Sequence, residues 1–462
     1  MASTYLKRTA GTSTENYKYT FSAWVKRTGV LGASSANEVL FSNWTNSSNS
    51  AYIRFEDIND NLHVYDQYGS GPDLNYKTNM KFRDPNAWYH IVVNVDGTRS
   101  ANQRCKIYVN GSEVSCSSTT DTGGTLAMKT VTTANNMIVG AMARTPSPTH
   151  EYFFSGLMSH VYYIDGTGYD ASYFGETDAT TGEWKIKTSV SVTYGNNGFS
   201  ILQDGNTITD QSSNSNDFTL GAGTLTNTED CPSDVFCTLN PLQKPYVGQG
   251  DDRYYGNTTI QGSHADWQRV YGTIGVKKGK FYYEWKCSKV TSHNNRIGWD
   301  SIDNINLGAD NYYSGLTVAG NGELRGGING YSGYDPNAVQ MTAAYSGGNF
   351  GFVTGDILGM ALDRDNNTIS IYKNGNLEVN AYSFAGASNC SILLSKGYFV
   401  APSQNFQSPV GSNDQKGQFN FGNGYFEGTA ITSEGTNASG IGKFEYDVPS
   451  GYTAWSTKGL NA

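Results

Sequence analysis

Charge is scarce in this sequence, and basic charge is scarcer still. Asp, Glu, Lys and Arg make up 16% of the 462 residues, against about 25% in a typical soluble domain. The net charge is −9, and the longest basic clusters, Lys26-Arg27 and residues 276–280, are short. A chain without a basic patch lacks the electrostatic footprint for duplex DNA or anionic membranes. We therefore expect no nucleic-acid partner and no membrane insertion.

Cysteine is also rare, and long apolar runs are absent. The six cysteines include no CxxC pair, so no zinc site is expected. The first residues, MASTYLKRT, contain no apolar core, and the sequence has no run of about 20 apolar residues, so we expect neither a signal peptide nor a membrane span. We expect synthesis in a cytoplasm, where reducing conditions disfavour disulfides. Cys231 and Cys237, which flank Pro232, could still meet.

Helical patterning is missing as well. No long window combines helical periodicity with helix-forming residues. The 54 glycines and 32 tyrosines, together with abundant Ser, Thr and Asn, favour strands and turns. The fold class is therefore predicted to be all-β, and the length allows about two or three domains.

Two stretches share one pattern of strands and turns. Residues 355–379, GDILGMALDRDNNTISIYKNGNLEV, alternate apolar and polar residues on both sides of a polar turn and then reach an Asn-Gly pair. This pattern predicts three successive antiparallel strands. Residues 88–114, WYHIVVNVDGTRSANQRCKIYVNGSEV, repeat it. We interpret the two stretches as the central meanders of two separate sandwiches, because their spacing is too long for a solenoid or propeller.

The turn within residues 88–114 fixes an expected register for the strands on either side of it. If Asn110-Gly111 is a two-residue hairpin turn, Val109 faces Ser112. Counting outward then places Cys105 opposite Cys116, so this pair could also meet. The count puts them at a hydrogen-bonded pair, where cross-strand partners lie farther apart. The sequence leaves both possible disulfides open.

Residues 1–175 and 251–425 resemble two known families. FSAWVKR, FRDPNAWYHIVVNVD, KIYVNG and FSGLMSHVYYIDG, in this order, resemble laminin-G-like or concanavalin A-like lectin domains. That resemblance implies a jelly-roll sandwich of two antiparallel sheets. GKFYYEW, GDILGMALDRDNNTISIYKNG and GYFVAPS resemble a SPRY domain, which implies a second β-sandwich used for binding rather than catalysis.

The remaining segments are expected to be packed. Residues 176–250 are rich in Pro, Gly, Asn and Ser, but their large apolar residues are too numerous for a free linker, so we expect a packed connector with a few strands. Residues 426–462 are polar with scattered aromatic anchors, and we expect a C-terminal strap. The whole order of motifs resembles a group of marine bacteriophage virion proteins, which implies display on a particle surface.

Catalytic patterns are not found in the sequence. A concanavalin-like glycosidase would carry alternate carboxylates on one strand, and Glu445 and Asp447 lack a third partner. No histidine accompanies a Gly-x-Ser-x-Gly motif. His90 and His160 lie within predicted strands and are interpreted as structural. We therefore expect a protein that is not an enzyme.

Two polar segments could be read as cation sites. Residues 363–367 have the spacing D-x-D-x-N but lack the glycine and glutamate that complete a calcium loop, so we interpret them as a turn between strands. Asp210, Asn214, Asn216 and Asp217 fall within eight residues, and either a hard cation or Asx-turns would account for them. No cofactor is expected.

Tyrosine-rich loops offer the groups that sugars need. Aromatic rings stack on sugar C–H faces while amides and carboxylates pair with hydroxyls. Two loops between residues 311 and 335 supply both types, and the candidate ligand-binding residues are Tyr312, Tyr313, Asn329, Tyr331, Tyr334 and Asp335. The same composition also suits ordinary packing between protein subunits.

These observations predict a non-enzymatic structural and binding protein on the surface of a bacteriophage particle, assembled in the host cytoplasm. It would form a fibre, knob or capsid decoration that contacts host-surface glycans or neighbouring virion proteins. We expect a homo-oligomer formed through sandwich faces, edge strands or the connector, because the sequence has no coiled-coil heptads or collagen triplets. The alternatives are a cement protein that binds only virion proteins and a polysaccharide depolymerase.

Overall fold

The computed structural model describes most of the chain in two compact units, Met1–Leu225 and Thr226–Ala462. The described residues are 3–29, 37–46, 48–69, 72–121, 136–144, 149–203, 205, 207–242, 252–262, 268–290, 295–301, 315–320, 324–327, 339–340, 351–383, 399–406 and 415–462. The fold is nearly all-β, as predicted. The boundary between the units falls within the segment 176–250. Among the described residues, no helix is long and apolar enough to span a membrane.

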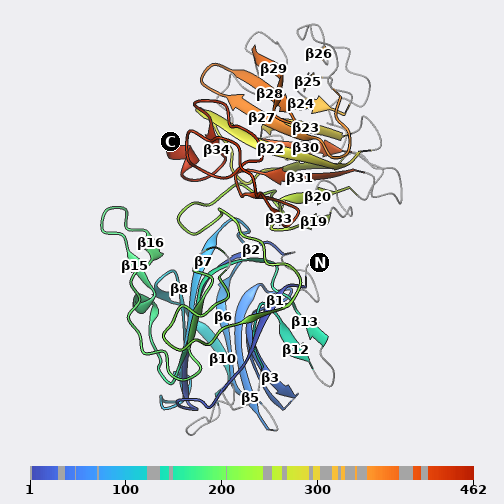
Figure 1. The fold of residues 1–462 in the computed structure, drawn as a ribbon. Helices are drawn as coiled ribbons and strands as arrows, with labels where there is room; N and C mark the ends of the chain where they lie inside the picture. The colour runs from blue at the N-terminus through green and yellow to red at the C-terminus, as the bar shows by residue number, and fades with distance from the viewer. Residues whose placement is uncertain are drawn as a thin grey trace. The chain divides into compact units, whose positions relative to one another are not determined.

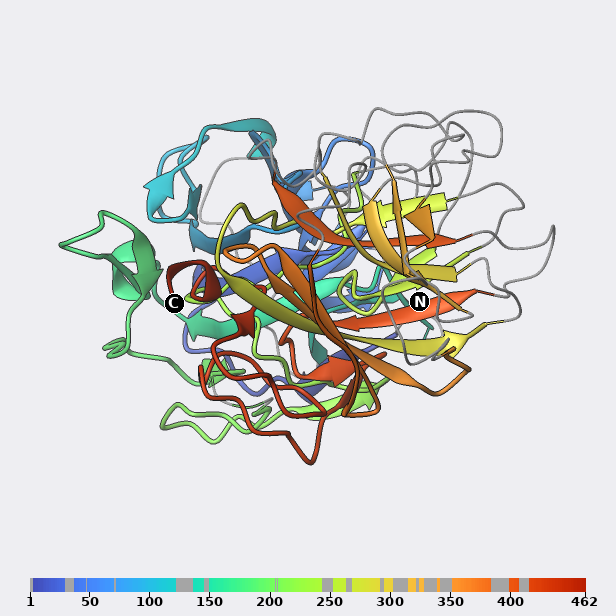
Figure 2. The same cartoon turned by 90° about the horizontal axis from the view of Figure 1, so that it is seen from above.

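The first unit is a sandwich of two antiparallel sheets (Figure 1). An eight-stranded sheet runs in the order β10-β6-β5-β4-β3-β11-β1-β18, and a six-stranded sheet in the order β17-β14-β2-β7-β8-β9. Two small hairpins, β12–β13 and β15–β16, accompany them, and the second projects from the unit in Figures 1 and 2. The bounds are β1 Tyr5–Thr9, β2 Lys18–Arg27, β3 Glu38–Asn46, β4 Asn49–Phe55, β5 Asn61–Tyr68, β6 Pro72–Lys81, β7 Trp88–Asp96, β8 Cys105–Val109, β9 Ser112–Glu113, β10 Cys116–Asp121, β11 Asn136–Val139, β12 Met142–Arg144, β13 Thr149–Glu151, β14 Gly156–Asp165, β15 Gly175–Thr177, β16 Trp184–Ile186, β17 Phe199–Ile201 and β18 Thr219–Ala222.

Alternation along the strands decides which side chains reach the core of this sandwich. Ile53 and Phe55 of β4 and Leu62 and Val64 of β5 are buried between the sheets. The residues between them point to the other side of the eight-stranded sheet, because successive side chains of a strand face opposite ways. The outer face of this sheet therefore carries a second set of side chains, among which Tyr52 packs with Val39 and Met142.

The first meander confirms the predicted turn but not the predicted pairing beyond it. Val109 pairs with Ser112, as expected. The return strand β9 has only two residues, and the chain then crosses to the other sheet, where Cys116 pairs with Thr78 of β6. The expectation that Cys105 lies opposite Cys116 is therefore wrong. The five described cysteines, Cys105, Cys116, Cys231, Cys237 and Cys287, are not joined in disulfides.

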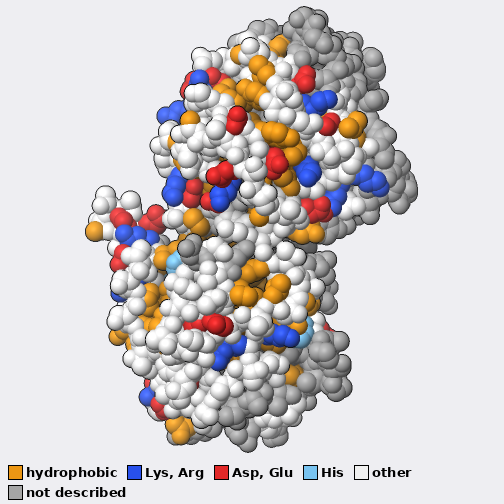
Figure 3. Space-filling model, viewed as in Figure 1, with side chains coloured by type: hydrophobic (Ala, Val, Ile, Leu, Met, Phe, Trp, Pro, Cys, Tyr) orange, Lys and Arg blue, Asp and Glu red, His pale blue; other side chains and the backbone are white. Residues whose placement is uncertain are grey.

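The second unit is also a sandwich of two sheets, and acidic and basic side chains are interspersed on the face of this unit that Figure 3 shows. One sheet runs in the order β19-β20-β31-β22-β27-β28-β29, with β34 added parallel to β22, and the other in the order β21-β30-β23-β24-β25-β26. The strands β27, β28 and β29 confirm the three-stranded meander predicted for residues 355–379. The bounds are β19 Asp252–Tyr254, β20 Thr259–Gln261, β21 Gln268–Tyr271, β22 Lys280–Lys289, β23 Asn295–Ser301, β24 Gly315–Ala319, β25 Leu324–Gly327, β26 Val339–Gln340, β27 Ile357–Asp363, β28 Thr368–Lys373, β29 Asn376–Ser383, β30 Val400–Phe406, β31 Lys416–Asn420, β32 Tyr425–Phe426, β33 Thr429–Ala430 and β34 Thr453–Ala454.

The C-terminal residues pack against the second sandwich. Phe444 contacts the Tyr282 ring edge-on at 5.1 Å between ring centroids, and Val448 is buried in the same cluster. Strand β34 (Figure 1, dark red) pairs with the start of β22. Trp455, which follows β34, lies in the core of the unit. These contacts make the C-terminal segment part of the folded unit.

Candidate functional site

The loop residues predicted to bind ligand, Tyr312, Tyr313, Asn329, Tyr331, Tyr334 and Asp335, all lie outside the described residues. The structure therefore neither groups nor separates them, and that hypothesis stays a prediction. The described part of the chain offers another candidate, on the outer face of the eight-stranded sheet of the first unit.

Three neighbouring strands place aromatic and polar side chains on this outer face. Tyr52 of β4 pairs with Tyr65 of β5, and Arg54 of β4 pairs with His63 of β5. On the other side of β5, Lys77 and Asn75 of β6 pair with His63 and Tyr65. Paired residues share a face of the sheet. We call this group the tyrosine face, and its members are Tyr52, Arg54, Glu56, His63, Tyr65, Gln67, Asn75 and Lys77.

Two stacked rings form the centre of the tyrosine face. The rings of Tyr52 and Tyr65 lie 4.8 Å apart between centroids, with only 7° between their planes. The Arg54 guanidinium lies 4.5 Å from the centroid of the Tyr52 ring, and burial raises the pKa of Tyr52 to about 12. Tyr52 is 9% exposed, whereas Tyr65 is half-buried. Tyr65 therefore offers the more open aromatic surface.

Glu56 organises the charges at one end of the tyrosine face. Its Oε1 atom lies 2.7 Å from Lys77 Nζ, 3.1 Å from His63 Nδ1 and 3.8 Å from Arg54 Nη2. Burial by itself would raise the pKa of Glu56, but hydrogen bonds from His63 and Lys77 outweigh it and lower the pKa to about 2. Glu56 is thus a stable anion that holds its neighbours in place.

Hydrogen bonds fix the other polar groups of the face. His63 Nε2 lies 2.8 Å from Asn75 Oδ1, and the Tyr65 hydroxyl donates to Gln67 Oε1 at 2.5 Å. Gln67 in turn donates to the carbonyl of Gly69 at 3.1 Å. A linked set of this kind is held in one geometry before any ligand arrives, which lowers the entropy cost of binding.

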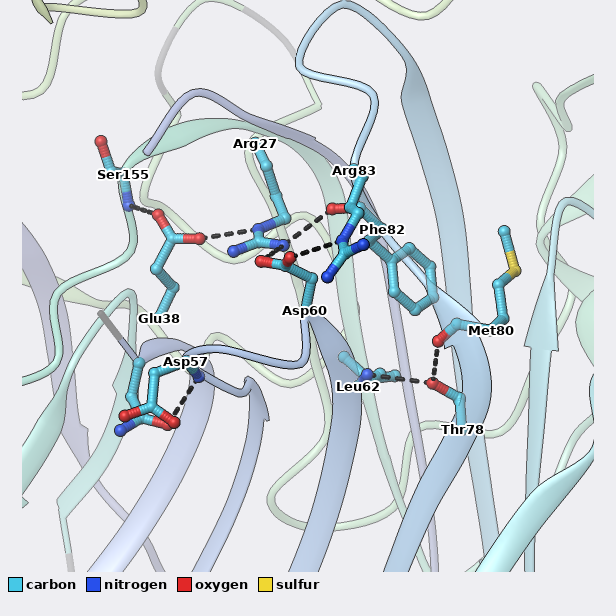
Figure 4. A network of polar contacts seen from close by, with 11 residues as sticks. Arg27, Glu38, Asp57, Asp60, Leu62, Thr78, Met80, Phe82, Arg83 and Ser155 are labelled. Carbon is cyan, nitrogen blue, oxygen red and sulfur yellow. Dashed lines mark hydrogen bonds and ion pairs between the residues drawn. The ribbon is translucent and has the colours of Figure 1, made fainter. Parts of the chain in front are cut away.

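A buried ion-pair network holds the turn that carries Glu56 (Figure 4). Arg27, at the end of β2, donates to Glu38 Oε2 at 2.7 Å and to the Phe82 carbonyl at 2.8 Å. Its Nη1 also lies 3.4 Å from Asp60, and Arg83 donates to the other oxygen of Asp60 at 2.8 Å. Burial raises the pKa of Glu38 despite the opposing charge of Arg27. The network ties the two sheets together at the β4–β5 turn.

The opposite sheet carries a serine–histidine pair, but its geometry is wrong for catalysis. The Trp184 indole donates to His90 Nδ1 at 2.9 Å. The hydrogen of a neutral His90 must therefore sit on Nε2, which lies 2.9 Å from Ser22 Oγ and donates to it. A general base needs the reverse arrangement, with Nε2 accepting from the serine. Burial lowers the pKa of His90 to about 3, so this residue is structural, as predicted.

His160 is also held by local contacts. Its Nδ1 lies 2.7 Å from Ser159 Oγ, and its backbone N–H donates to the carbonyl of Leu202 at 2.9 Å. The residue sits at a register shift in the pairing of β14 with β2. These contacts give it a structural role, as predicted.

The polar segments considered as cation sites are hydrogen-bonded turns. Asp363 Oδ1 accepts from the backbone N–H groups of Asp365 and Asn366, as expected for a turn between β27 and β28. The Asp210 carboxylate accepts from the N–H groups of Ser200, Ser212 and Asn216 and from the Ser212 hydroxyl. Of the two possibilities for residues 210–217, these contacts favour the Asx-turn. In the described part of the chain, no three His, Cys, Asp or Glu residues cluster as metal ligands would.

The first unit matches a known family. Residues 1–167 match the family described as the concanavalin A-like lectin/glucanases superfamily. No curated protein matches the sequence.

Solved structures of other proteins resemble parts of the chain. The SPRY domain of human HERC1 is 16% identical with a TM-score of 0.28, covering 39% of this chain and 96% of that domain. A putative carbohydrate-binding protein from Bacteroides ovatus ATCC 8483 is 16% identical with a TM-score of 0.30, covering 48% of this chain and 57% of that protein. A SAP-like pentraxin from Limulus polyphemus is 13% identical with a TM-score of 0.29, covering 44% of this chain and 90% of that chain.

The sequence holds a signal for the tyrosine face. In the two strands AYIRF and LHVY, the residues Tyr52, Arg54, His63 and Tyr65 alternate with purely apolar ones. Such alternation, with the aliphatic residues inward, places Tyr52 and Arg54 outward together, and His63 and Tyr65 likewise. What the sequence could not supply was the register that sets Tyr52 directly beside Tyr65.

Proposed function

We propose that this protein binds carbohydrate without cleaving it and holds the glycan on the tyrosine face of its lectin domain. The observation that carries the proposal is the stacked, near-parallel pair of Tyr52 and Tyr65, bordered by amide, imidazole and cationic side chains. Aromatic rings pack against the C–H faces of sugars, while fixed polar groups set the orientation of a ligand. The match of residues 1–167 to the concanavalin A-like lectin/glucanases superfamily supports carbohydrate as the ligand.

The charge state of Glu56 favours binding over hydrolysis. Glycoside cleavage needs one protonated carboxylic acid to donate to the leaving oxygen and a second carboxylate across the bond. The low pKa of Glu56, about 2, keeps it ionised, so it cannot serve as that acid near neutral pH. Its ion pair with Lys77 and its contact with His63 Nδ1 give it a structural role instead.

We further propose that the protein is displayed on a bacteriophage particle, as a fibre, knob or capsid decoration that is assembled in the host cytoplasm. The order of motifs along the sequence supports this placement. The SPRY-like unit would then contact neighbouring virion proteins or further copies of the chain. Mass spectrometry and immunogold labelling of purified particles test the placement, and absence of the protein from particles would contradict it.

Glycan binding by matched variants tests the carbohydrate function. We expect the purified chain to bind bacterial envelope glycans on an array, and Tyr65→Ala to lose this binding. Tyr173 is 40% exposed on another part of the same unit, so Tyr173→Ala is the control that should bind like the wild type. No binding by the wild type would favour a cement protein, and release of reducing sugar would establish a depolymerase.

A further inference from the structure

Arg54 of the tyrosine face differs from Arg27 and Arg83 of the same unit. Arg27 donates to Glu38 Oε2 at 2.7 Å and to the Phe82 carbonyl at 2.8 Å. Arg83 donates to Asp60 at 2.8 Å. By contrast, the nearest carboxylate oxygen to Arg54 is Glu56 Oε1 at 3.8 Å, which is too far for a hydrogen bond.

The donors of Arg54 lack acceptors within the described residues. Its Nε atom is buried and has no hydrogen-bond partner, although the side chain as a whole keeps 17% of its surface exposed. A guanidinium has five N–H donors, and a buried donor without an acceptor is unfavourable. The cation–π contact with Tyr52 holds the group in position without using those donors.

The charges around Arg54 leave its positive charge largely uncompensated. Glu56 lies closer to Lys77, at 2.7 Å, and to His63, at 3.1 Å, than to Arg54. Burial lowers the pKa of His63, even though its contact with Glu56 opposes this. Apart from His63, this end of the face carries two cations, Arg54 and Lys77, and one anion, Glu56. Asp73, the other charged residue of β6 near the face, lies toward its opposite end, close to Tyr65.

We propose that the glycan bound by the tyrosine face is acidic, and that the Arg54 guanidinium receives the carboxylate of a uronic or nonulosonic acid residue. The inference rests on the proposed function, since it names the chemistry of the ligand of that face. A planar carboxylate accepts hydrogen bonds from two parallel N–H groups of arginine. The opposite charges strengthen these bonds, and the paired geometry makes the recognition specific. Tyr65 stacks on Tyr52 and Arg54 is held over Tyr52, so a glycan that packs one residue on Tyr65 would reach the Arg54 guanidinium with a residue farther along its chain.

A glycan array of neutral, carboxylated, phosphorylated and sulfated microbial glycans tests the inference. We expect carboxylated glycans to bind and their neutral counterparts to bind at least tenfold more weakly. The best carboxylated glycan is then treated with carbodiimide and borohydride, which converts its carboxylates to alcohols and should cause the same loss. Preference for phosphorylated or sulfated glycans over carboxylated ones would overturn the assignment of a carboxylate.

Variants separate the role of Arg54 from the function of the face. Arg54→Gln should bind the acidic glycan at least tenfold more weakly, while Arg54→Lys should lie between, because lysine keeps the charge but not the two parallel donors. Lys106 is part-exposed on the other sheet and pairs with Glu113, so Lys106→Gln controls for loss of one positive charge. Circular dichroism and thermal unfolding of each variant check that it is folded.

The outcomes distinguish the two proposals. If the wild type binds no glycan at all, the carbohydrate function itself is wrong. If it binds neutral and acidic glycans equally, and Tyr65→Ala loses both, the function stands and the acidic ligand is wrong. If acidic glycans are preferred but folded Arg54→Gln binds like the wild type, the role of Arg54 is wrong.

Discussion

Asn110 and Asn374 hold the hairpins of the two units with the same pair of hydrogen bonds. Asn110 donates its backbone N–H to the His90 carbonyl at 2.9 Å, and its Oδ1 accepts the N–H of His90 at 2.8 Å. Asn374 makes both bonds with Ile357, each at 2.8 Å. Both asparagines have a left-handed backbone conformation, with φ of 47° and 50°. Each hairpin thus uses asparagine for its backbone conformation and for its side-chain acceptor.

Asn110→Ala should destabilise the first unit, because the N–H of His90 loses its acceptor and alanine is strained at positive φ. We expect the free energy of unfolding to fall by about 1–3 kcal/mol. Asn110→Asp keeps the oxygen and tolerates the turn, so it should cost less than half as much. Urea denaturation of both variants measures the difference, and equal losses would show that the side-chain bond contributes nothing.

Arg27→Met should destabilise the same unit more strongly. The substitution leaves the carboxylates of Glu38 and Asp60 buried, and Glu38 loses the arginine with which it forms an ion pair. Removing one partner of a buried ion pair typically costs about 3–5 kcal/mol. Arg83→Met is the matched control, since the Arg83 side chain is 52% exposed and should cost about 1 kcal/mol or less. The measurement is denaturant unfolding followed by tryptophan fluorescence, and similar losses for both variants would contradict the role of the network.

Glu284 should make the second unit less stable as pH rises. Its carboxylate accepts from the backbone N–H groups of Glu445 and Tyr446 and from Asn420. Burial raises its pKa to about 7, although these donors oppose the rise. The folded state then holds a proton that the unfolded chain has released, so stability declines between about pH 4.5 and 7.

Glu284→Gln tests this pH dependence, because glutamine does not titrate. We expect the wild type to lose about 1–3 kcal/mol between pH 5 and pH 8 through this group. The variant should be less stable at both pH values, since its amide nitrogen faces N–H donors, but its stability should change less with pH. Urea denaturation at the two pH values measures both slopes, and parallel slopes would contradict the assignment.

His90 should stay neutral far below the ordinary pKa of histidine. Burial holds its pKa at about 3, and the Trp184 indole fixes the hydrogen on Nε2. The ¹⁵N shifts of the imidazole should therefore report an unprotonated Nδ1 from neutral pH down to about pH 4. Titration of His90 near pH 6.5, as for a solvent-exposed histidine, or a proton on Nδ1 at neutral pH would contradict the geometry.

Local patterns predicted the parts of the fold that depend on neighbouring residues. The Asn-Gly pairs, which permit positive φ, identified both hairpins, and alternation identified β2, β7, β27 and β28. Counting residues outward from the Asn110-Gly111 turn gave the wrong partner for Cys116, because the chain passes from one sheet to the other between β9 and β10. The sequence has no local feature that shows the return strand ending after two residues.

Long-range partners explain why the candidate site was not predicted. Tyr52 and Tyr65 stack only because β4 and β5 pair in one particular register, and the turn between them is held by Arg27 from another sheet. The loops chosen from composition, which contain Tyr312 and Tyr331, lie outside the described residues, so their role stays a prediction.

Calorimetric titration of one acidic glycan into the wild type and into Tyr65→Ala, side by side, tests the central claim most directly. The stacked ring is the main contact surface of the tyrosine face, so we predict that its removal weakens affinity at least tenfold while the variant stays folded. Equal affinity for the two proteins would show that the glycan does not bind there.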